Sequence, residues 1–266
     1  MPIITLLSDF GCADTYVGQM KGAVLSVCPT ATLVDLTHEV PAQDVRRGAF
    51  LLWSAVLAFP PGTFHLAIVD PGVGSVRRAI ALRTARGDVL IGPDNGILVP
   101  AADRLGGMTF AVELSNPEFW RERLSRTFHG RDLFGPVAGH LARGAELRAM
   151  GAPISNLSAP VRFPVPVADA HRIAGEIVHV DGFGTLVTNI PEEMLPPYFV
   201  VQLDSHRVRG AREAVYESVP SGSLIALVGS SALLEIAARG GSAASVLGIS
   251  VGHPLHVQPA ATQQGD

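Results

Sequence analysis

The first seventy residues alternate short apolar segments with helical segments, and this order constrains the fold more than any other feature of the chain. Apolar runs over 3–7, 32–36 and 64–69 predict buried strands. Apolar residues that recur at three and four positions over 15–27 predict a helix, and a second helix is expected over 44–57. Strands that alternate with helices form a parallel sheet covered on both faces. We therefore predict an N-terminal parallel-sheet α/β domain.

Two carboxylates stand where such a sheet binds ligands. Asp9 follows the first predicted strand, and Asp70 ends the third. Open α/β sheets bind ligands beyond the carboxyl ends of their strands. A further short helix is expected over 132–142, directly after His129, with Asp132 as its capping residue.

The second half of the chain changes character. Four prolines between residues 151 and 170 indicate a linker. Beyond it, short β-branched runs alternate with turn signals, which predicts a smaller, β-barrel-like domain. The predicted boundaries are an α/β domain over 1–160, a linker over 161–170 and the β-barrel-like domain over 171–266. The strands expected in the last domain lie at 176–180, 186–190, 199–203 and 224–228.

Composition narrows the classes of partner. The 266 residues are 47% hydrophobic, which is enough for a full core, and 20 basic against 24 acidic side chains give a net charge of −4. That charge argues against a nucleic-acid partner. The opening apolar run reaches Asp9 too soon to form a signal core or to span a membrane, so no membrane partner is expected. With only Cys12 and Cys28, a disulfide framework is not possible, and a reduced, cytoplasmic setting fits best.

Three side chains suggest chemistry, and each also has a structural interpretation. Asp70 and Arg77 flank a loop with two glycines, which either brings the backbone close to a ligand or forms a simple structural turn. His129 is either hydrogen-bonded scaffolding or a catalytic imidazole, and a partner carboxylate would favour catalysis. The sequence does not show whether Asp70 is that partner.

Other polar residues allow a nucleoside site or a metal site. Asp9 occupies the position of the acidic residue that binds ribose hydroxyls in dinucleotide folds, but no G-x-G-x-x-G follows the first strand. A nucleoside without a pyrophosphate therefore remains possible. His38, His65 and His140 are interpreted as scaffold. A metal site built from His65, Asp70 and His129 is conceivable, although no ligand pair has a recognised spacing.

Six short motifs occur in order along the chain. They are Ser8-Asp-Phe-Gly11, Asp70-Pro-Gly-Val-Gly-Ser75 with Arg77, Gly92-Pro-Asp-Asn-Gly96, Thr127-Phe-His-Gly-Arg-Asp132, Asp181-Gly-Phe-Gly184 with Thr188-Asn-Ile190, and Leu234-Glu-Ile-Ala237. Together they resemble the S-adenosyl-L-methionine (SAM) hydrolase family, also called SAM hydroxide adenosyltransferases, which are related to the fluorinase and chlorinase. The resemblance implies an α/β domain, a β-barrel-like domain and a homotrimer that binds SAM between one subunit's N-domain and a neighbour's C-domain. It also implies that water attacks C5′ of SAM to give adenosine and methionine.

The resemblance also assigns roles to single residues. Asp70, Arg77 and His129 would hold and activate the water. The substrate-binding residues would be Asp9 for the ribose, Asp181 and Ser230 for the methionine moiety, and Phe183 near the adenosine. The chain departs from the family pattern at Thr185, where an Asn usually faces adenine, and at 231–233, where Gly-Tyr is usual.

The implied reaction needs no metal or cofactor, because a sulfonium leaves as a neutral thioether. Asp70 favours water over a halide, since its negative charge repels chloride and fluoride, whereas the related halogenases carry Tyr there. Gly130 stands where the fluorinase has a halide-binding Ser. The alternatives are a SAM-dependent halogenase, a protein that binds SAM or adenosine without turnover, and a metallohydrolase.

Overall fold

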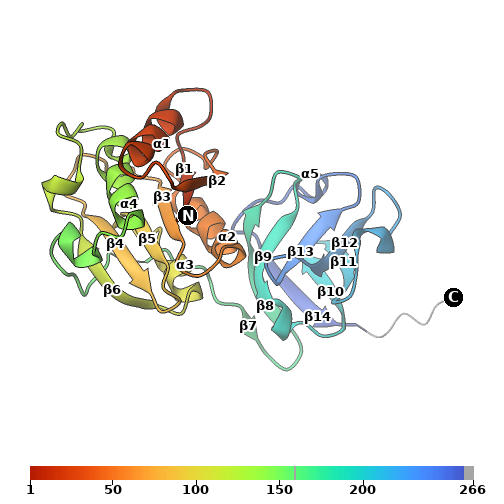
Figure 1. The fold of residues 1–266 in the computed structure, drawn as a ribbon. Helices are drawn as coiled ribbons and strands as arrows, with labels where there is room; N and C mark the ends of the chain where they lie inside the picture. Colours follow the sequence, from red (N-terminus) through yellow and green to blue (C-terminus); the bar gives the residue numbers. More distant parts are fainter. Residues whose placement is uncertain (159, 261–266) are drawn as a thin grey trace. The chain divides into compact units, whose positions relative to one another are not determined.

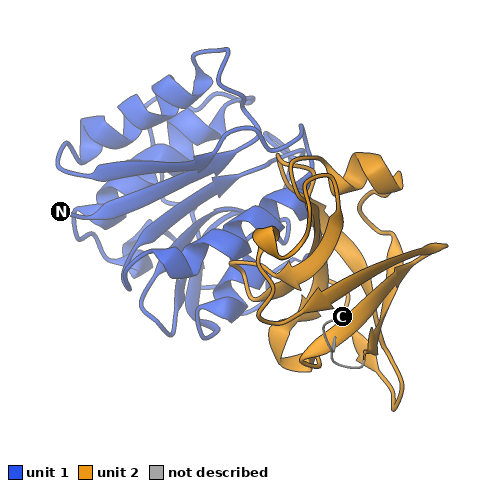
Figure 2. Cartoon of the chain, turned by 90° about the vertical axis from the view of Figure 1, so that its right-hand side faces the viewer, with its two compact units in different colours: residues 1–162 blue, residues 163–266 orange. Residues whose placement is uncertain are grey.

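The computed structural model describes residues 1–158 and 160–260, and the chain divides into two compact units, residues 1–162 and 163–266 (Figure 2). Val167–Ala168, within the predicted linker, pairs with the strand that follows it. The last six residues of the predicted C-terminal domain, 261–266, lie outside the described residues.

Unit 1 contains the strands and helices expected at its start, followed by three strands that the sequence pattern did not reveal (Figure 1). The helix expected over 44–57 is α2 (Val45–Ala55), followed by a short 3₁₀ turn, Val56–Ala58. In chain order the elements are β1 (Ile3–Ser8), α1 (Tyr16–Val27), β2 (Thr32–Thr37), α2 (Val45–Ala55), β3 (Phe64–Ile68), β4 (Ala79–Thr84), β5 (Val89–Pro93), α3 (Val99–Arg104), β6 (Met108–Glu113) and α4 (Gly135–Ala142).

The six strands form one sheet in the order β2-β1-β3-β5-β4-β6. The first four are parallel, which confirms the predicted parallel arrangement of β1, β2 and β3, whereas β4 runs antiparallel to both of its neighbours, so the sheet is mixed. Ser8 of β1 pairs with Ile68 of β3. The segments that carry Asp9 and Asp70 therefore leave the sheet at the same edge.

Helices cover both faces of this sheet. Met20 and Val24 of α1 and Val137 of α4 share one buried cluster with Ile4 and Leu6 of β1. On the opposite face α2 packs so closely that a Cβ on its Gly48 would lie 3.0 Å from Val69 and 3.7 Å from Leu7. The strand ends are thus held between two helical layers.

The helix after His129 begins differently from the prediction. Residues Gly130–Phe134 form a π-helical turn that continues into α4. The prediction that Asp132 caps this helix is wrong: Asp132 lies inside the π turn, and its buried carboxylate accepts hydrogen bonds from Arg131 and the Ser125 N–H. The extra residue of a π turn commonly marks a functional segment.

Unit 2 is a closed β-barrel with a short extra strand. Seven strands pair in the order β14-β10-β11-β12-β13-β9-β8, and β14 also pairs with β8, which closes the ring. Alternate residues of β10 (Phe199, Val201 and Leu203) are buried in its core. The elements are β7 (Val167–Ala168), β8 (Ile173–Val180), β9 (Leu186–Pro191), β10 (Tyr198–Leu203), β11 (His206–Ala211), β12 (Leu224–Val228), β13 (Leu233–Ala238), α5 (Ala243–Leu247) and β14 (Pro254–Pro259).

The helices in the described part of the chain were also compared with the length and hydropathy that a bilayer requires. None of them combines sufficient length with sufficient apolar character to cross a membrane.

Candidate active site

Asp70, Arg77 and His129 form one hydrogen-bonded cluster in unit 1. The Arg77 guanidinium donates from Nε to Asp70 Oδ1 over 2.9 Å and from Nη2 to Asp70 Oδ2, so the pair is bidentate. The same Nη2 lies 2.8 Å from His129 Nδ1. Asp70 and Arg77 are mostly buried, with side-chain exposures of 6% and 12%. Three residues distant in sequence are therefore joined through one guanidinium.

The protonation of His129 follows from this contact. A guanidinium can only donate, so His129 Nδ1 accepts and the neutral ring carries its proton on Nε2. Burial lowers the pKa of His129, and the charge of Arg77 lowers it further, against the opposite effects of Asp70 and Asp132. The imidazole is therefore neutral at neutral pH and presents a donor at Nε2.

The loop between Asp70 and Arg77 is shaped by tight turns. The Ser75 hydroxyl donates to the Gly72 carbonyl over 2.7 Å and accepts the Arg77 N–H over 3.2 Å. Gly74 has a φ of +75°, and a Cβ at that position would overlap the carbonyl oxygen of Arg126. Only glycine combines this φ with such a close backbone approach.

We expect Gly74→Ala to lower turnover at least tenfold, because the loop must shift to clear Arg126 and Arg77 shifts with it. Steady-state kinetics checks this. Gly87→Ala is the matched control, because Gly87 also has a positive φ (+94°) but a Cβ there meets open space. Equal losses in both variants would contradict the role given to the Gly74 contact.

Aromatic side chains pack around the cluster. The Arg77 guanidinium lies 5.4 Å from the centroid of the Phe134 ring. Phe10 and Phe128 pack edge to face, with centroids 5.6 Å apart. A Cβ on Gly130 would lie 3.0 Å from Phe10 and 3.2 Å from Phe128, so these rings leave little space for a side chain at position 130.

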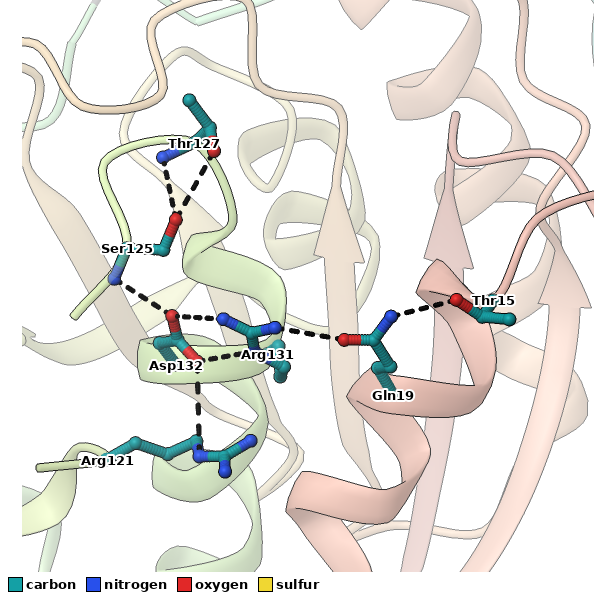
Figure 3. A network of polar contacts seen from close by, with 7 residues as sticks. All are labelled: Thr15, Gln19, Arg121, Ser125, Thr127, Arg131 and Asp132. Atoms are coloured by element: carbon teal, nitrogen blue, oxygen red, sulfur yellow. Dashed lines mark hydrogen bonds and ion pairs between the residues drawn. The ribbon is translucent and has the colours of Figure 1, made fainter. Parts of the chain in front are cut away.

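A polar network holds the segment that leads to His129 (Figure 3). The buried Asp132 carboxylate accepts from the Arg131 guanidinium over 2.6 Å and from the Ser125 N–H over 2.9 Å. Arg131 also donates to Gln19 on α1, and Gln19 donates to Thr15. Burial raises the pKa of Asp132, but the hydrogen bonds from Arg131 and Ser125 outweigh that effect and lower it overall. The network thus fixes the π turn against α1.

Asp9 is also in unit 1, directly after β1. One carboxylate oxygen, Oδ2, accepts the backbone N–H of Gln43 over 2.8 Å. The side chain is half-buried. No hydrogen bond to Oδ1 is found among the described residues, so this oxygen has acceptor capacity for a ligand hydroxyl.

The remaining predicted site residues lie in unit 2. Asp181 Oδ1 accepts the N–H groups of Phe183 and Thr185 over 2.9 and 2.8 Å, which shapes the turn between β8 and β9. Phe183 is 84% exposed and Thr185 is buried, and both line a cavity of about 530 Å³. Ser230 is exposed in the β12–β13 turn and does not line this cavity.

The conceivable metal set is not assembled in the structure. His65 contacts Thr5 and Asp88, whereas Asp70 and His129 contact Arg77. Within residues 1–158 and 160–260, no three His, Cys, Asp or Glu side chains are grouped closely enough to hold a metal ion.

Comparison with known families matches both units of the chain. The model of the SAM hydroxide adenosyltransferase N-terminal domain matches residues 4–151, and that of the C-terminal domain matches residues 175–256. The chain belongs to the SAM hydroxide adenosyltransferase family. This confirms the resemblance found in the sequence motifs.

Individual relatives of this SAM hydroxide adenosyltransferase family member match from about 70% to almost all of the chain. A protein of Salinispora arenicola named (R)-S-adenosyl-L-methionine hydrolase is 42% identical over 96% of this chain and 97% of its own. A fluorinase of Nocardia brasiliensis is 34% identical over 71% of each chain. A crystal structure of an uncharacterized conserved protein from Thermotoga maritima superposes with a TM-score of 0.91 and 33% identity, covering 96% of this chain and all of that one.

The structure adds residues of this family member that sequence reasoning missed. Tyr216 and Arg239 line the same cavity as Phe183 and Thr185, and Arg239 Nη1 donates to the Val219 carbonyl over 2.7 Å. The barrel topology brings both residues to the cavity, because the segment after β11 and the end of β13 lie beside the β8–β9 turn. No spacing in the sequence signals this arrangement.

The departure from the family pattern at 231–233 falls in a tight turn of the family fold. Gly229 N–H donates to the Leu233 carbonyl over 2.9 Å, which closes the turn between β12 and β13. Ala232 adopts a left-handed conformation with a φ of +59°, which is unusual for a residue with a Cβ. Residues 231–233 do not line the cavity.

Proposed function

We propose that this protein hydrolyses SAM to adenosine and L-methionine, with water as the nucleophile at C5′. Family membership and the 42% identical relative named (R)-S-adenosyl-L-methionine hydrolase support this proposal. The observation that carries it is the joining of Asp70, Arg77 and His129 through one guanidinium, because this cluster can hold a polar nucleophile.

The main task of catalysis in this reaction is to activate the nucleophile, because water is a weak one. The C5′–O bond forms as the C5′–S bond breaks, and the sulfur keeps the electron pair and leaves as the neutral thioether of methionine. No acid, metal or cofactor is required for that departure, so we propose SAM as substrate with no cofactor. Orientation of the water and removal of its proton are the tasks left to the protein.

We assign these tasks to the three residues as follows. Asp70 takes the proton, because its carboxylate keeps acceptor capacity beside the two Arg77 contacts, whereas neutral His129 already has its proton on Nε2. His129 orients the water through that Nε2–H. Arg77 fixes both partners and stabilises developing negative charge on oxygen.

Water is favoured over a halide in this proposal. The Asp70 carboxylate repels an anion, while water can donate a hydrogen bond to it. The packing of Phe10 and Phe128 against Gly130 leaves little space for a halide-binding side chain at that position. A halogenase would need a nucleophile pocket without this charge.

We further propose that Asp9 binds the ribose, that Phe183 and Thr185 contact the adenosine, and that Asp181 and Ser230 bind the methionine moiety. The first belongs to unit 1 and the others to unit 2. In the proposed homotrimer each site is completed by a neighbouring subunit. We propose a cytoplasmic location, in keeping with the free thiols of Cys12 and Cys28.

The proposed reaction is tested by incubating the purified protein with SAM and following adenosine by chromatography. Adenosine must rise above a heat-killed control, and its absence would overturn the proposal. Tight SAM binding by calorimetry with SAM recovered intact would instead identify a binding protein. Loss of activity after dialysis against EDTA would favour a metallohydrolase. Light scattering at assay concentration tests the trimer, which a monomer would contradict.

We expect turnover to stay level from about pH 8 down to the ordinary histidine pKa of 6.5, and to fall only at lower pH. The reason is that the lowered pKa keeps His129 neutral, and only a neutral Nδ1 accepts from Arg77. The measurement is kcat against pH.

The control for this pH profile is His140, whose pKa is also lowered, by burial first and by Arg143 second. His129→Asn should remove the acid limb of the profile, and His140→Asn should leave it in place. An unchanged limb in His129→Asn would contradict the assignment.

A further inference from the structure

A second hydrogen-bonded chain lies next to Asp9 and takes no part in the proposed reaction. Ser8 Oγ lies 2.7 Å from His38 Nδ1, and His38 Nε2 lies 3.1 Å from Asp35 Oδ1. Lys21 Nζ donates to the other Asp35 oxygen over 2.6 Å. Ser8 is fully buried and His38 is 3% exposed. We call Ser8, His38 and Asp35 the relay.

The Asp35 carboxylate can only accept, so His38 Nε2 carries a proton and donates to Asp35 Oδ1. With the ring in its neutral form, Nδ1 accepts from the Ser8 hydroxyl. The Ser8 oxygen then accepts the N–H of Phe10 over 3.3 Å. The relay therefore runs in one direction, from the backbone of Phe10 to the exposed end of Asp35.

The same three residue types form the nucleophilic triads of many hydrolases, but burial rules out that role here. A nucleophilic serine must be reachable by its substrate, whereas Ser8 has no exposed surface. Its hydroxyl hydrogen-bonds to His38, and its oxygen also accepts the Phe10 N–H. The relay can therefore act only by holding the residues around it.

Those residues enclose Asp9. Ser8 precedes it in the chain, and Phe10 follows it with its N–H bonded to Ser8 Oγ. The N–H of Gly11 donates to the His38 carbonyl over 2.8 Å, so His38 holds the segment through its ring and through its backbone. The Asp9 carboxylate itself receives only the Gln43 N–H among these contacts.

We propose that His38 is a positioning residue that fixes the Asp9 carboxylate for a vicinal diol, acting through Ser8. This inference rests on the proposed function, in which Asp9 binds the ribose. A carboxylate accepts two hydrogen bonds from a diol only when the plane of the carboxylate is held in place. The relay fixes the backbone of Ser8 and Phe10, on both sides of Asp9.

The test compares binding of adenosine with binding of 2′,3′-dideoxyadenosine, which lacks the diol. We expect the wild-type protein to bind adenosine more tightly, and we expect Ser8→Ala and His38→Gln each to reduce that preference about tenfold. His38→Asn should retain most of it, because its amide oxygen takes the place of Nδ1 opposite Ser8, whereas the Gln amide takes the place of Nε2. Isothermal titration calorimetry measures both affinities.

Thr5 offers a matched control in the same strand. Its hydroxyl lies 2.8 Å from His65 Nδ1, so the pair repeats the hydroxyl–imidazole contact of Ser8 and His38, although His65 Nε2 lies 3.6 Å from Asp88. Thr5→Val should therefore lower stability without changing the diol preference. Equal effects of Thr5→Val and Ser8→Ala on the preference would overturn the inference, as would a wild-type protein without any preference.

The outcomes separate this inference from the proposed function. In one outcome the wild-type protein forms no adenosine from SAM but prefers adenosine over the dideoxy analogue, and Ser8→Ala removes that preference. The hydrolase proposal then fails, and the positioning role of His38 is supported. If SAM is hydrolysed and Ser8→Ala keeps the full preference, the relay is overturned and the hydrolase stands.

Discussion

We expect Asp70→Ala to lower kcat for SAM by about 10²- to 10⁴-fold while the affinity for adenosine stays near the wild-type value. The substitution removes the proton acceptor and also releases Arg77, which Asp70 holds with two hydrogen bonds. Asp70 is assigned to the water and not to the nucleoside, so ground-state binding is spared. Single-turnover kinetics gives the rate, and calorimetry gives the affinity.

The adjacent pair provides the control for this prediction. Arg78 donates from Nε to Asp94 Oδ2 over 2.8 Å, so it repeats the arginine–aspartate contact one residue further along the loop. Arg78→Ala should lower stability and leave turnover close to wild type. Undiminished turnover in Asp70→Ala would remove Asp70 from the mechanism, and equal losses in both variants would point to the fold of the loop.

The largest effect on stability is expected from Asp88→Asn, at about 3 kcal/mol lost from the free energy of unfolding. Asp88 is fully buried and accepts from Arg86 Nε over 2.7 Å and Nη2 over 3.0 Å, beside the buried His65. The amide leaves the mostly buried Arg86 charge without its carboxylate. Urea unfolding measures the difference.

The same carboxylate gives stability a defined pH dependence. Burial raises the pKa of Asp88, but its contacts with His65 and Arg86 outweigh that effect and lower the pKa from 3.8 to about 2. The folded state thus binds this proton less readily than the unfolded state, and the contribution of about 2 kcal/mol is complete above pH 4. It is lost as the pH falls from about 4 to 2.

A surface pair serves as the control for Asp88. Asp169 and Arg172 are both more than half exposed and lie 3.5 Å apart. Asp169→Asn should change stability little, because exposed ion pairs contribute little. If Asp88→Asn unfolds at the wild-type urea concentration at neutral pH, the buried pair does not stabilise the fold as argued.

The sequence predicted those helices and strands whose apolar residues recur at a regular spacing. β1, α1, β2 and β3 were expected because their apolar spacing reports burial on one or two faces. β4 and β5 were missed: they are joined by a tight hairpin, and their runs of apolar residues give no period. The π turn before α4 was also missed, since one inserted residue leaves the spacing of apolar positions almost unchanged.

The sequence predicted those residues of the candidate site that belong to short motifs. Asp70, Arg77 and His129 were singled out by residue type and position, but only the fold brings residue 129 to a loop 52 residues earlier. His38 was interpreted as scaffold from its position at a strand end, and its partners Ser8 and Asp35 belong to two different strands, β1 and β2. Pairings of this kind depend on sheet order, which local sequence does not encode.

The sharing of Arg77 has a consequence for redesign. Because one guanidinium serves an acid and an imidazole at once, a change at any of the three positions alters the other two, and their effects on rate will not add. Conversion of this scaffold to another nucleophile therefore has to exchange all three side chains together. A single swap at Asp70 leaves a surplus cation that recruits whichever anion the solution supplies.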